Sequence, residues 1–101
     1  MRTIVARSEE MGLNPATMVS IAICESGLKI NALNINKNKT KDRGIFQLNS
    51  VHNKRLSQMR LNPDNYLDNI NYALFLAKTE GLRHWSASTK CWKPRIALNS
   101  T

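Results

Sequence analysis

The sequence predicts a mostly α-helical (α+β) domain with at most one short, irregular β-hairpin. Apolar residues recur at helical spacing in two segments, residues 15–26 and 66–80, and both segments are flanked by residues typical of helix caps. A polar stretch rich in Asn and Lys lies between them, and no segment alternates for long enough to form an extended strand. The chain has 101 residues with no repeat and no linker, so we expect a single domain over residues 1–101.

The first two helices are expected over residues 4–11 and from Pro15 to Gly27. Thr3 is a suitable N-cap for the first, and Asn14 followed by proline is a common start for the second. One face of the second helix consists of Met18, Ile21, Ala22 and Glu25. Further apolar residues widen that face, so this segment is expected to be the central, nearly buried helix.

The middle of the chain, residues 31–43, is polar and indicates a loop or a short irregular hairpin. Gly44 then permits a tight turn, and the following "IFQLN" returns the chain to the core, with Ile45 and Phe46 as core residues. This apolar run is too short to distinguish helix from strand. Residues 50–66 are expected to hold one short helix at most.

A later helix is expected from Tyr66 to Gly81, after a cap-and-proline start signal at residues 62–64. Its apolar series is Leu67, Ile70, Ala73, Leu74 and Ala77. The final segment carries Trp85, Trp92 and a possible cap, Ser86. Core packing is the expected role of Trp85, with stacking on a sugar ring as the alternative.

The charge balance is strongly basic, with 15 Lys and Arg against 7 Asp and Glu, a net charge of +8. Such a charge favours polyanionic partners, among them nucleic acid, anionic lipid and anionic cell-wall polymers. No apolar run approaches the roughly 20 residues of a membrane span. The first residues lack the pattern of a signal peptide, which favours a mature or excised domain, or delivery by another route such as a phage virion.

The two cysteines, Cys24 and Cys91, do not form a metal-type C-x-x-C pattern. Two free thiols are the simpler interpretation, with Cys24 as a small core residue. A disulfide between the two cysteines is the alternative.

Glu25 raises the central question of the sequence, because an acid ends the most apolar segment. Burial and the negative end of the helix dipole both disfavour the carboxylate, so its pKa should be raised. A carboxyl group that stays protonated near neutral pH is what a general acid needs. On this pattern alone, a purely structural glutamate is the alternative.

Asp42 is the second candidate acid and lies in a polar stretch with basic neighbours. Those neighbours are Lys37, Lys39, Lys41 and Arg43. Nearby positive charge keeps a carboxylate ionised, so the two acids occupy opposed environments, as they do in glycosidases. A turn residue is the alternative for Asp42.

Two stretches resemble known families. "GLNPATMVSIAICESGLKINALN", residues 12–34, resembles the opening of a lytic transglycosylase domain of the soluble-lytic type, with its Gly-Leu-x-Pro, Glu-Ser-Gly and Ala-x-Asn motifs. "TKDRGIFQLNS", residues 40–50, resembles that family's Gly-x-x-Gln motif and, more closely, a stretch of c-type lysozymes. The separation of Glu25 and Asp42 also matches the two c-type acids. The resemblance runs from about Gly12 to Trp85 and implies a lysozyme-like fold.

The resemblance implies cleavage of the β-1,4 bond between N-acetylmuramic acid and N-acetylglucosamine in peptidoglycan. Glu25 would act as acid and then as base, giving 1,6-anhydro products in a lytic transglycosylase. In the alternative, a hydrolytic lysozyme (muramidase), water attacks and Asp42 assists. No cofactor or metal is implied. The expected partner is the glycan strand of the wall, bound by a monomer that acts outside the cytoplasm.

Four further residues are implied at the substrate: Ser26, Gly44, Gln47 and Asn49. Amide side chains suit sugar hydroxyl and N-acetyl groups because they both donate and accept. Gly44 would let backbone approach the substrate. Ser26 could hydrogen-bond into the cleft, and a plain helix-end serine is its alternative.

The sequence also departs from these families. The tyrosine expected along the later helix is replaced by Leu76, and Tyr72 and Phe75 are out of register. "SASTKCWKPR" stands where an Ala-Tyr-Asn motif is usual, and the c-type disulfide framework is missing. A non-catalytic wall-binding domain is therefore kept as a rival. A nucleic-acid module is not expected, because the chain lacks a stacking aromatic set and a helix-turn-helix signature.

Overall fold

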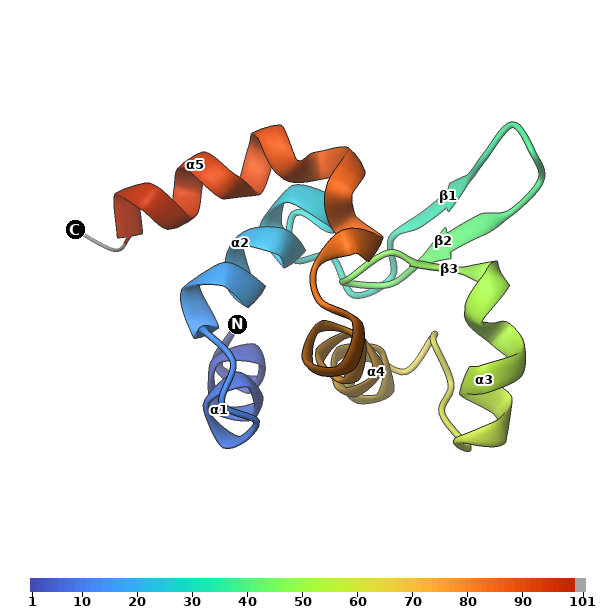
Figure 1. The fold of residues 1–101 in the computed structure, drawn as a ribbon. Coiled ribbons are helices and arrows are strands. Elements are labelled where there is room, and N and C mark those ends of the chain that lie inside the picture. The colour runs from blue at the N-terminus through green and yellow to red at the C-terminus, as the bar shows by residue number, and fades with distance from the viewer. Residues whose placement is uncertain (100–101) are drawn as a thin grey trace.

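The computed structural model describes residues 1–99 of the chain, and side chains through Ile96 (Figure 1). Its elements are α1 (Arg2–Glu10), α2 (Pro15–Ser26), β1 (Leu33–Ile35), β2 (Lys41–Arg43), β3 (Leu48–Asn49), the 3-10 helix η1 (Ser50–His52), α3 (Asn53–Gln58), α4 (Tyr66–Glu80), the 3-10 segment η2 (Arg83–Ser88) and α5 (Thr89–Asn99). The prediction of a mostly helical α+β fold is confirmed. Among the described residues, no helix combines the length and apolar character needed to cross a membrane.

Helix α2 is the central helix, as predicted, and packs most extensively against α1 and α5. The Asn14 side chain caps it by accepting a hydrogen bond from the Thr17 amide, and Pro15 occupies the first helical turn. Gly27 ends it in the left-handed conformation at φ 64°, which glycine adopts without steric cost. Met18, Ile21 and Ala22 are buried along its core face.

The core lies where α1, α2 and α4 meet the turn after β2 (Figure 1). Phe46 is fully buried in that turn, and Trp85 packs beside it with ring centroids 5.9 Å apart. The Trp85 indole N–H donates to the Phe46 carbonyl oxygen at 3.1 Å. Trp85 is therefore a core residue, as expected, and it fixes η2 against the turn that follows the hairpin.

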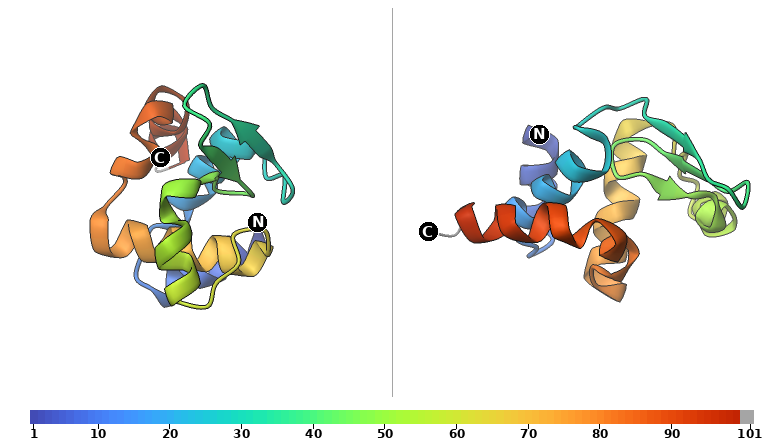
Figure 2. Two further views of the ribbon diagram at one scale, coloured as in Figure 1. Left: turned by 90° about the vertical axis from the view of Figure 1, so that its right-hand side faces the viewer. Right: turned by 90° about the horizontal axis from the view of Figure 1, so that it is seen from above.

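The polar stretch of residues 31–43 forms a hairpin rather than a loop, which settles the two alternatives. The sheet is antiparallel with the strand order β1-β2-β3. Asp42 lies in the middle strand, opposite Asn34 on one side and Asn49 on the other. Figure 2 shows the hairpin loop and the end of α5 at opposite ends of the molecule.

The turn at Gly44 depends on an asparagine of α4. The fully buried Asn69 accepts from the Phe46 amide at 3.0 Å and donates to the Arg43 carbonyl at 2.9 Å. A Cβ atom on Gly44 would lie 2.3 Å from Nδ2 of Asn69, so the Asn69 side chain would have to move away from the turn. The glycine therefore makes room for the side chain that holds this turn, and its φ of 78° also favours glycine.

Three cap predictions are wrong. Helix α1 starts earlier, with Met1 at the cap position, so Thr3 lies inside it. Helix α4 is capped by Asn65, which accepts from the Asp68 amide at 3.0 Å. A helix has one N-cap position, and the side chain of Asn62 instead closes a turn upstream. Ser86 lies inside η2 and does not begin α5.

The prediction of two free thiols is also wrong, because Cys24 and Cys91 form a disulfide with Cα atoms 5.9 Å apart. The end of α2 packs against the start of α5, which brings the two cysteines together across a sequence separation of 67. Trp92, next to Cys91, is buried and donates its indole N–H to the Trp85 carbonyl oxygen at 3.0 Å. The disulfide therefore ties the helix that carries Glu25 to the C-terminal segment.

Candidate active site

A cleft of about 300 Å³ lies where the end of α2, the sheet and η2 meet. Its lining residues are Glu25, Asp42, Gln47, Leu48, Asn49, Val51, His52, Leu76, His84, Trp85 and Ala87. The structure thus brings both candidate acids and both candidate amides to one cleft. Ser26 and Gly44 are not among the lining residues.

Glu25 lies in the last turn of α2 and is partly buried. Burial raises the pKa of the Glu25 carboxyl above its ordinary value, the Ser88 hydrogen bond lowers the pKa, and the charge of Asp42 raises it. The net direction is upward, as the sequence predicted. A raised pKa keeps a larger fraction of the group protonated, which suits a proton donor.

Ser88 is a site residue that the sequence reasoning missed. Its hydroxyl oxygen lies 2.5 Å from Oε2 of Glu25 and 3.1 Å from the carbonyl oxygen of Trp85. The disulfide joins the neighbour of Glu25 to Cys91, three residues after Ser88, and so fixes the two segments at this point. The sequence indicates the contact between Ser88 and Glu25 only if Cys24 and Cys91 are known to form a disulfide.

Asp42 is held by amide groups rather than by the lysines that the sequence suggested. Its Oδ1 accepts from the Asn49 side chain at 2.9 Å, and its Oδ2 accepts from Asn36 at 3.0 Å. Within the part of the chain that the structure describes, no ion pair involves Asp42. Lys41 precedes Asp42 in β2, and side chains alternate between the two faces of a strand, so these two neighbours lie on opposite faces.

The two predicted amides build the wall of the cleft. Gln47 has a φ of 53°, and its amide donates to the carbonyl oxygens of Ala32 and Gly44 and accepts from Asn34. Asn49 donates to Asp42 and, through its carbonyl oxygen, caps η1. Both side chains face the cleft while their hydrogen bonds hold the backbone around it. A direct contact with substrate stays a prediction for each.

Ser26 binds backbone instead of facing the cleft. Its hydroxyl oxygen lies 2.7 Å from the carbonyl oxygen of Ile45 and 3.2 Å from that of Ala22. This hydroxyl ties the end of α2 to the turn after β2. The geometry favours the structural alternative for Ser26 and places Gly44 in the same supporting role.

The replacement of the family tyrosine leaves an aliphatic wall. Leu76 is among the residues that line the cleft, and it is fully buried. Tyr72 lies one turn earlier on α4, is fully buried, and its hydroxyl contacts Arg55 and His52. The sequence expectation that Tyr72 is out of register for the cleft agrees with this placement.

A small helical domain with a three-stranded antiparallel sheet and an acid-bearing cleft between them is a lysozyme-like architecture. A family model described as "Lysozyme like domain" matches residues 5–87. The chain belongs to this lysozyme-like family, and the match covers the range over which the sequence showed its resemblance. Membership supports peptidoglycan-lytic activity at the level of the family.

Two relatives match about half of the chain. Protein IpgF of Shigella flexneri is 41% identical over 51 residues, which cover 50% of this chain and 34% of that protein. Protein IpgF of Shigella sonnei matches with the same identity and coverage. The matched stretch thus spans about a third of the length of these relatives.

Proposed function

We propose that residues 1–101 act as one lysozyme-like domain that cleaves the β-1,4 bond between N-acetylmuramic acid and N-acetylglucosamine in peptidoglycan, as a lytic transglycosylase. The observation that carries this proposal is Glu25, a partly buried acid on the wall of the cleft whose oxygen meets the Ser88 hydroxyl. Membership of the lysozyme-like family supports the substrate class.

The first step transfers the proton of Glu25 to the glycosidic oxygen as the bond from that oxygen to the muramyl C1 breaks. The N-acetyl group of the substrate stabilises the cationic carbon. Glu25, now a carboxylate, then removes the proton of the muramyl 6-hydroxyl, whose oxygen bonds to C1. One acid therefore serves both steps, no water is consumed, and a 1,6-anhydro sugar results.

Ser88 holds one oxygen of Glu25 during this cycle. A hydroxyl carries one hydrogen, so Ser88 donates either to Oε2 of Glu25 or to the carbonyl oxygen of Trp85. Donation to Oε2 leaves Oε1 as the oxygen that carries the reacting proton. When the hydroxyl turns toward Glu25, the Trp92 indole still satisfies the Trp85 carbonyl.

Hydrolysis is the second candidate reaction, because Asp42 lines the same cleft and its charge raises the pKa of Glu25. In a hydrolase, Asp42 would stabilise the cationic transition state, act as nucleophile or activate water. Asp42→Asn should therefore abolish most hydrolytic activity but cost a transglycosylase much less.

The deciding experiment is mass spectrometry of the soluble muropeptides released from purified peptidoglycan by the wild type and by Glu25→Gln. Products lighter by one water are anhydro sugars and support the transglycosylase. Products with free reducing ends identify a muramidase and make Asp42→Asn the next variant. If neither protein releases muropeptides while both bind the wall, the domain is a non-catalytic wall binder.

We also propose that the domain acts as a monomer outside the cytoplasm. Its net charge of +8 would hold it on the anionic wall. The Cys24–Cys91 disulfide supports this location, because disulfides persist in oxidising compartments. Wall binding should weaken as salt rises, and binding that does not depend on salt would contradict this role of the charge.

A further inference from the structure

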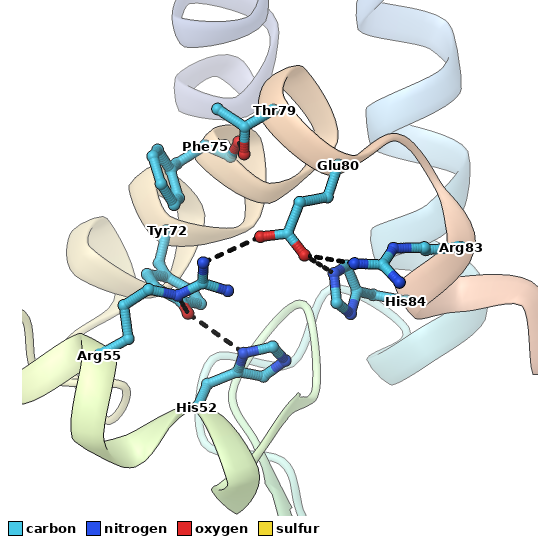
Figure 3. Close-up of polar contacts among 8 residues, drawn as sticks. All are labelled: His52, Arg55, Tyr72, Phe75, Thr79, Glu80, Arg83 and His84. Carbon is cyan, nitrogen blue, oxygen red and sulfur yellow. Dashed lines mark hydrogen bonds and ion pairs between the residues drawn. The ribbon is translucent and has the colours of Figure 1, made fainter.

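Two histidines lie on the wall of the cleft, and the proposed reaction leaves both unused. His52 ends η1 and His84 lies in η2, and both line the cleft that holds Glu25. Their ring centroids are 5.1 Å apart, and the rings meet edge to face. Figure 3 shows them beside a hydrogen-bonded cluster that joins α3, α4 and η2.

The contacts behind His52 determine where its proton lies. Nε of Arg55 donates to the hydroxyl oxygen of Tyr72 at 2.8 Å, because a guanidinium has no acceptor. The same hydroxyl lies 3.1 Å from Nδ1 of His52, which is the partner left for its own hydrogen (Figure 3). We assign Nδ1 of His52 as the acceptor, because this arrangement gives the Tyr72 hydroxyl both an acceptor for its hydrogen and a donor for its oxygen.

His52 is consequently neutral, with its hydrogen on Nε2. Burial lowers the pKa of His52 below its ordinary value, and the nearby His84 and Arg55 lower it further, whereas Glu80 raises it. Within the described residues, Nε2 of His52 makes no hydrogen bond. The ring thus carries an N–H donor that hydrogen-bonds to no other described residue.

The contacts behind His84 fix the position of one of its ring hydrogens. Oε1 of Glu80 accepts from Nε2 of His84 at 2.9 Å and from Arg83 at 2.8 Å, while Oε2 pairs with Arg55 at 2.9 Å. These hydrogen bonds from His84, Arg83 and Arg55 lower the pKa of Glu80 to about 2, so it is a carboxylate that can only accept. Nε2 of His84 therefore carries a hydrogen, and Nδ1 makes no hydrogen bond among the described residues.

We propose that His52 and His84 form a glycan-binding subsite of the cleft, in which Nε2–H of His52 donates to a hydroxyl or N-acetyl group of a saccharide and Nδ1 of His84 hydrogen-bonds to a neighbouring group of the same saccharide. The identity of the saccharide rests on the proposed function. Two ring nitrogens without a protein partner among the described residues suit sugar groups, which themselves both donate and accept.

An uncharged ligand is favoured over a carboxylate at this subsite. Asp42 lines the same cleft, and its negative charge repels an anionic group. The charges of Arg55 and Arg83 are engaged by Glu80 and do not face the cleft as free cations. Tyr72, Arg55 and Glu80 are therefore positioning residues, which set the tautomers of the two rings without touching the saccharide.

The first test reads the tautomers directly. Long-range ¹H–¹⁵N spectra of the histidine rings at pH 7 should show His52 protonated at Nε2 alone. Tyr72→Phe keeps the ring but removes the hydroxyl, and it should give His52 a mixture of tautomers. A doubly protonated His52, or one protonated at Nδ1, in the wild type would overturn the proposal.

The second test measures the binding of tetra-N-acetylchitotetraose, an uncharged and peptide-free oligosaccharide, to Glu25→Gln protein by calorimetry. His52→Ala and His84→Ala should each weaken binding about 3- to 10-fold, the range of one neutral hydrogen bond. His52→Gln, which keeps an uncharged N–H donor, should recover most of the loss. Lys54→Ala changes an exposed neighbour on α3 and is the matched control, expected to bind like the parent.

The outcomes separate this proposal from the proposed function, because binding needs no turnover. Unchanged affinity in both alanine variants, with the folded circular dichroism spectrum retained, refutes the subsite. Losses confined to a peptide-bearing muropeptide would assign the rings to a stem carboxylate and overturn the glycan assignment. If the wild type leaves peptidoglycan intact but the histidines still govern oligosaccharide binding, the subsite stands and the proposed reaction fails.

Discussion

Glu25 and Glu80 occupy similar places in the fold and behave in opposite ways. Each lies at the C-terminal end of a long helix, α2 or α4, and each helix is followed by a glycine cap. The helix dipole disfavours an anion at both positions. Yet the pKa of Glu25 is raised by burial, whereas the pKa of Glu80 is lowered to about 2.

The difference comes from the partners and not from the helix. Glu80 contacts two guanidinium groups and an imidazole. Arg83 and His84 donate hydrogen bonds to it, and Arg55 forms an ion pair with it. Glu25 meets one neutral hydroxyl and the charge of Asp42. A helix end therefore permits either a proton donor or a fixed carboxylate, and the neighbouring elements decide which one forms.

The sharpest way to test this comparison is to remove each charge in turn. Glu25→Gln should lower the rate of peptidoglycan cleavage by about 10²- to 10⁴-fold, the range of general acid–base catalysis. Glu80→Gln should stay within about tenfold of the wild type, because it acts only by positioning His84. Release of soluble muropeptides measures both variants. Equal losses in the two would contradict the separation of roles.

Removing the disulfide should change the surroundings of Glu25 but not the cluster around Glu80. Cys24→Ala combined with Cys91→Ala should lower the free energy of unfolding by about 4 kcal/mol, for a loop closed across 67 residues. Denaturant unfolding measures this loss. Where the variant stays folded, kcat should fall because Ser88 is no longer held against Glu25.

The ring signals of His52 provide the internal control for the same variant. The cluster around Glu80 contains no cysteine, so the tautomer of His52 should be unchanged at a temperature where the variant is folded. A change in both regions would show that the disulfide supports the whole cleft.

Ser88→Ala should give a smaller effect on the pH dependence. The Ser88 hydrogen bond lowers the pKa of Glu25, so its removal raises that pKa further. The acid then stays protonated to higher pH, and the alkaline limb of kcat/KM should move upward, with a rate loss of about tenfold. Ser86→Ala, an exposed serine of the same segment, is the control and should leave the profile in place.

The smallest expected effects are on stability against pH, and they have opposite signs. The folded pKa of Glu80 is about 2 against an ordinary value of 4.5, so its contribution to stability is present above pH 4.5 and is lost as pH falls toward 2. Glu25 has a raised folded pKa, so folding favours its protonated form and stability falls as pH rises from 4.5 through that pKa. At pH 7, Glu25→Gln should therefore raise Tm slightly and Glu80→Gln should lower it. Thermal melts across pH 2 to 8 measure both, and shifts of the same sign would refute the comparison.

The parts of the fold that local signals encode could be predicted from the sequence. Asn14, Pro15 and Gly27 mark the ends of α2 because capping depends on adjacent backbone, and helical spacing places Glu25 on its core side. The prediction of a helix cap fails where two candidate residues lie close together, as Asn62 and Asn65 do before α4. Only the one beside the first turn can reach the free amides.

The residues around the acid could not be predicted, because their contacts join distant segments. Ser88 meets Glu25 across 63 positions, and nothing near either residue encodes that distance. Asp42 was found through its motif, but its amide partners follow from strand register, which the sequence did not specify. His52 and His84 come together only after α4 and η2 are placed, so neither stood out in the sequence.

The chain order of these contacts sets the order in which the cleft is assembled. Glu25 lies in the first third of the sequence, whereas Ser88 and Cys91 come near its end. A polypeptide that emerges N-terminus first, from a ribosome or through a narrow channel, presents its acid long before the hydroxyl and the thiol that hold it. Glu25 therefore gains its hydrogen-bond partner only after residue 88 has emerged. A chain halted before residue 88 carries Glu25 without the partner that orients it.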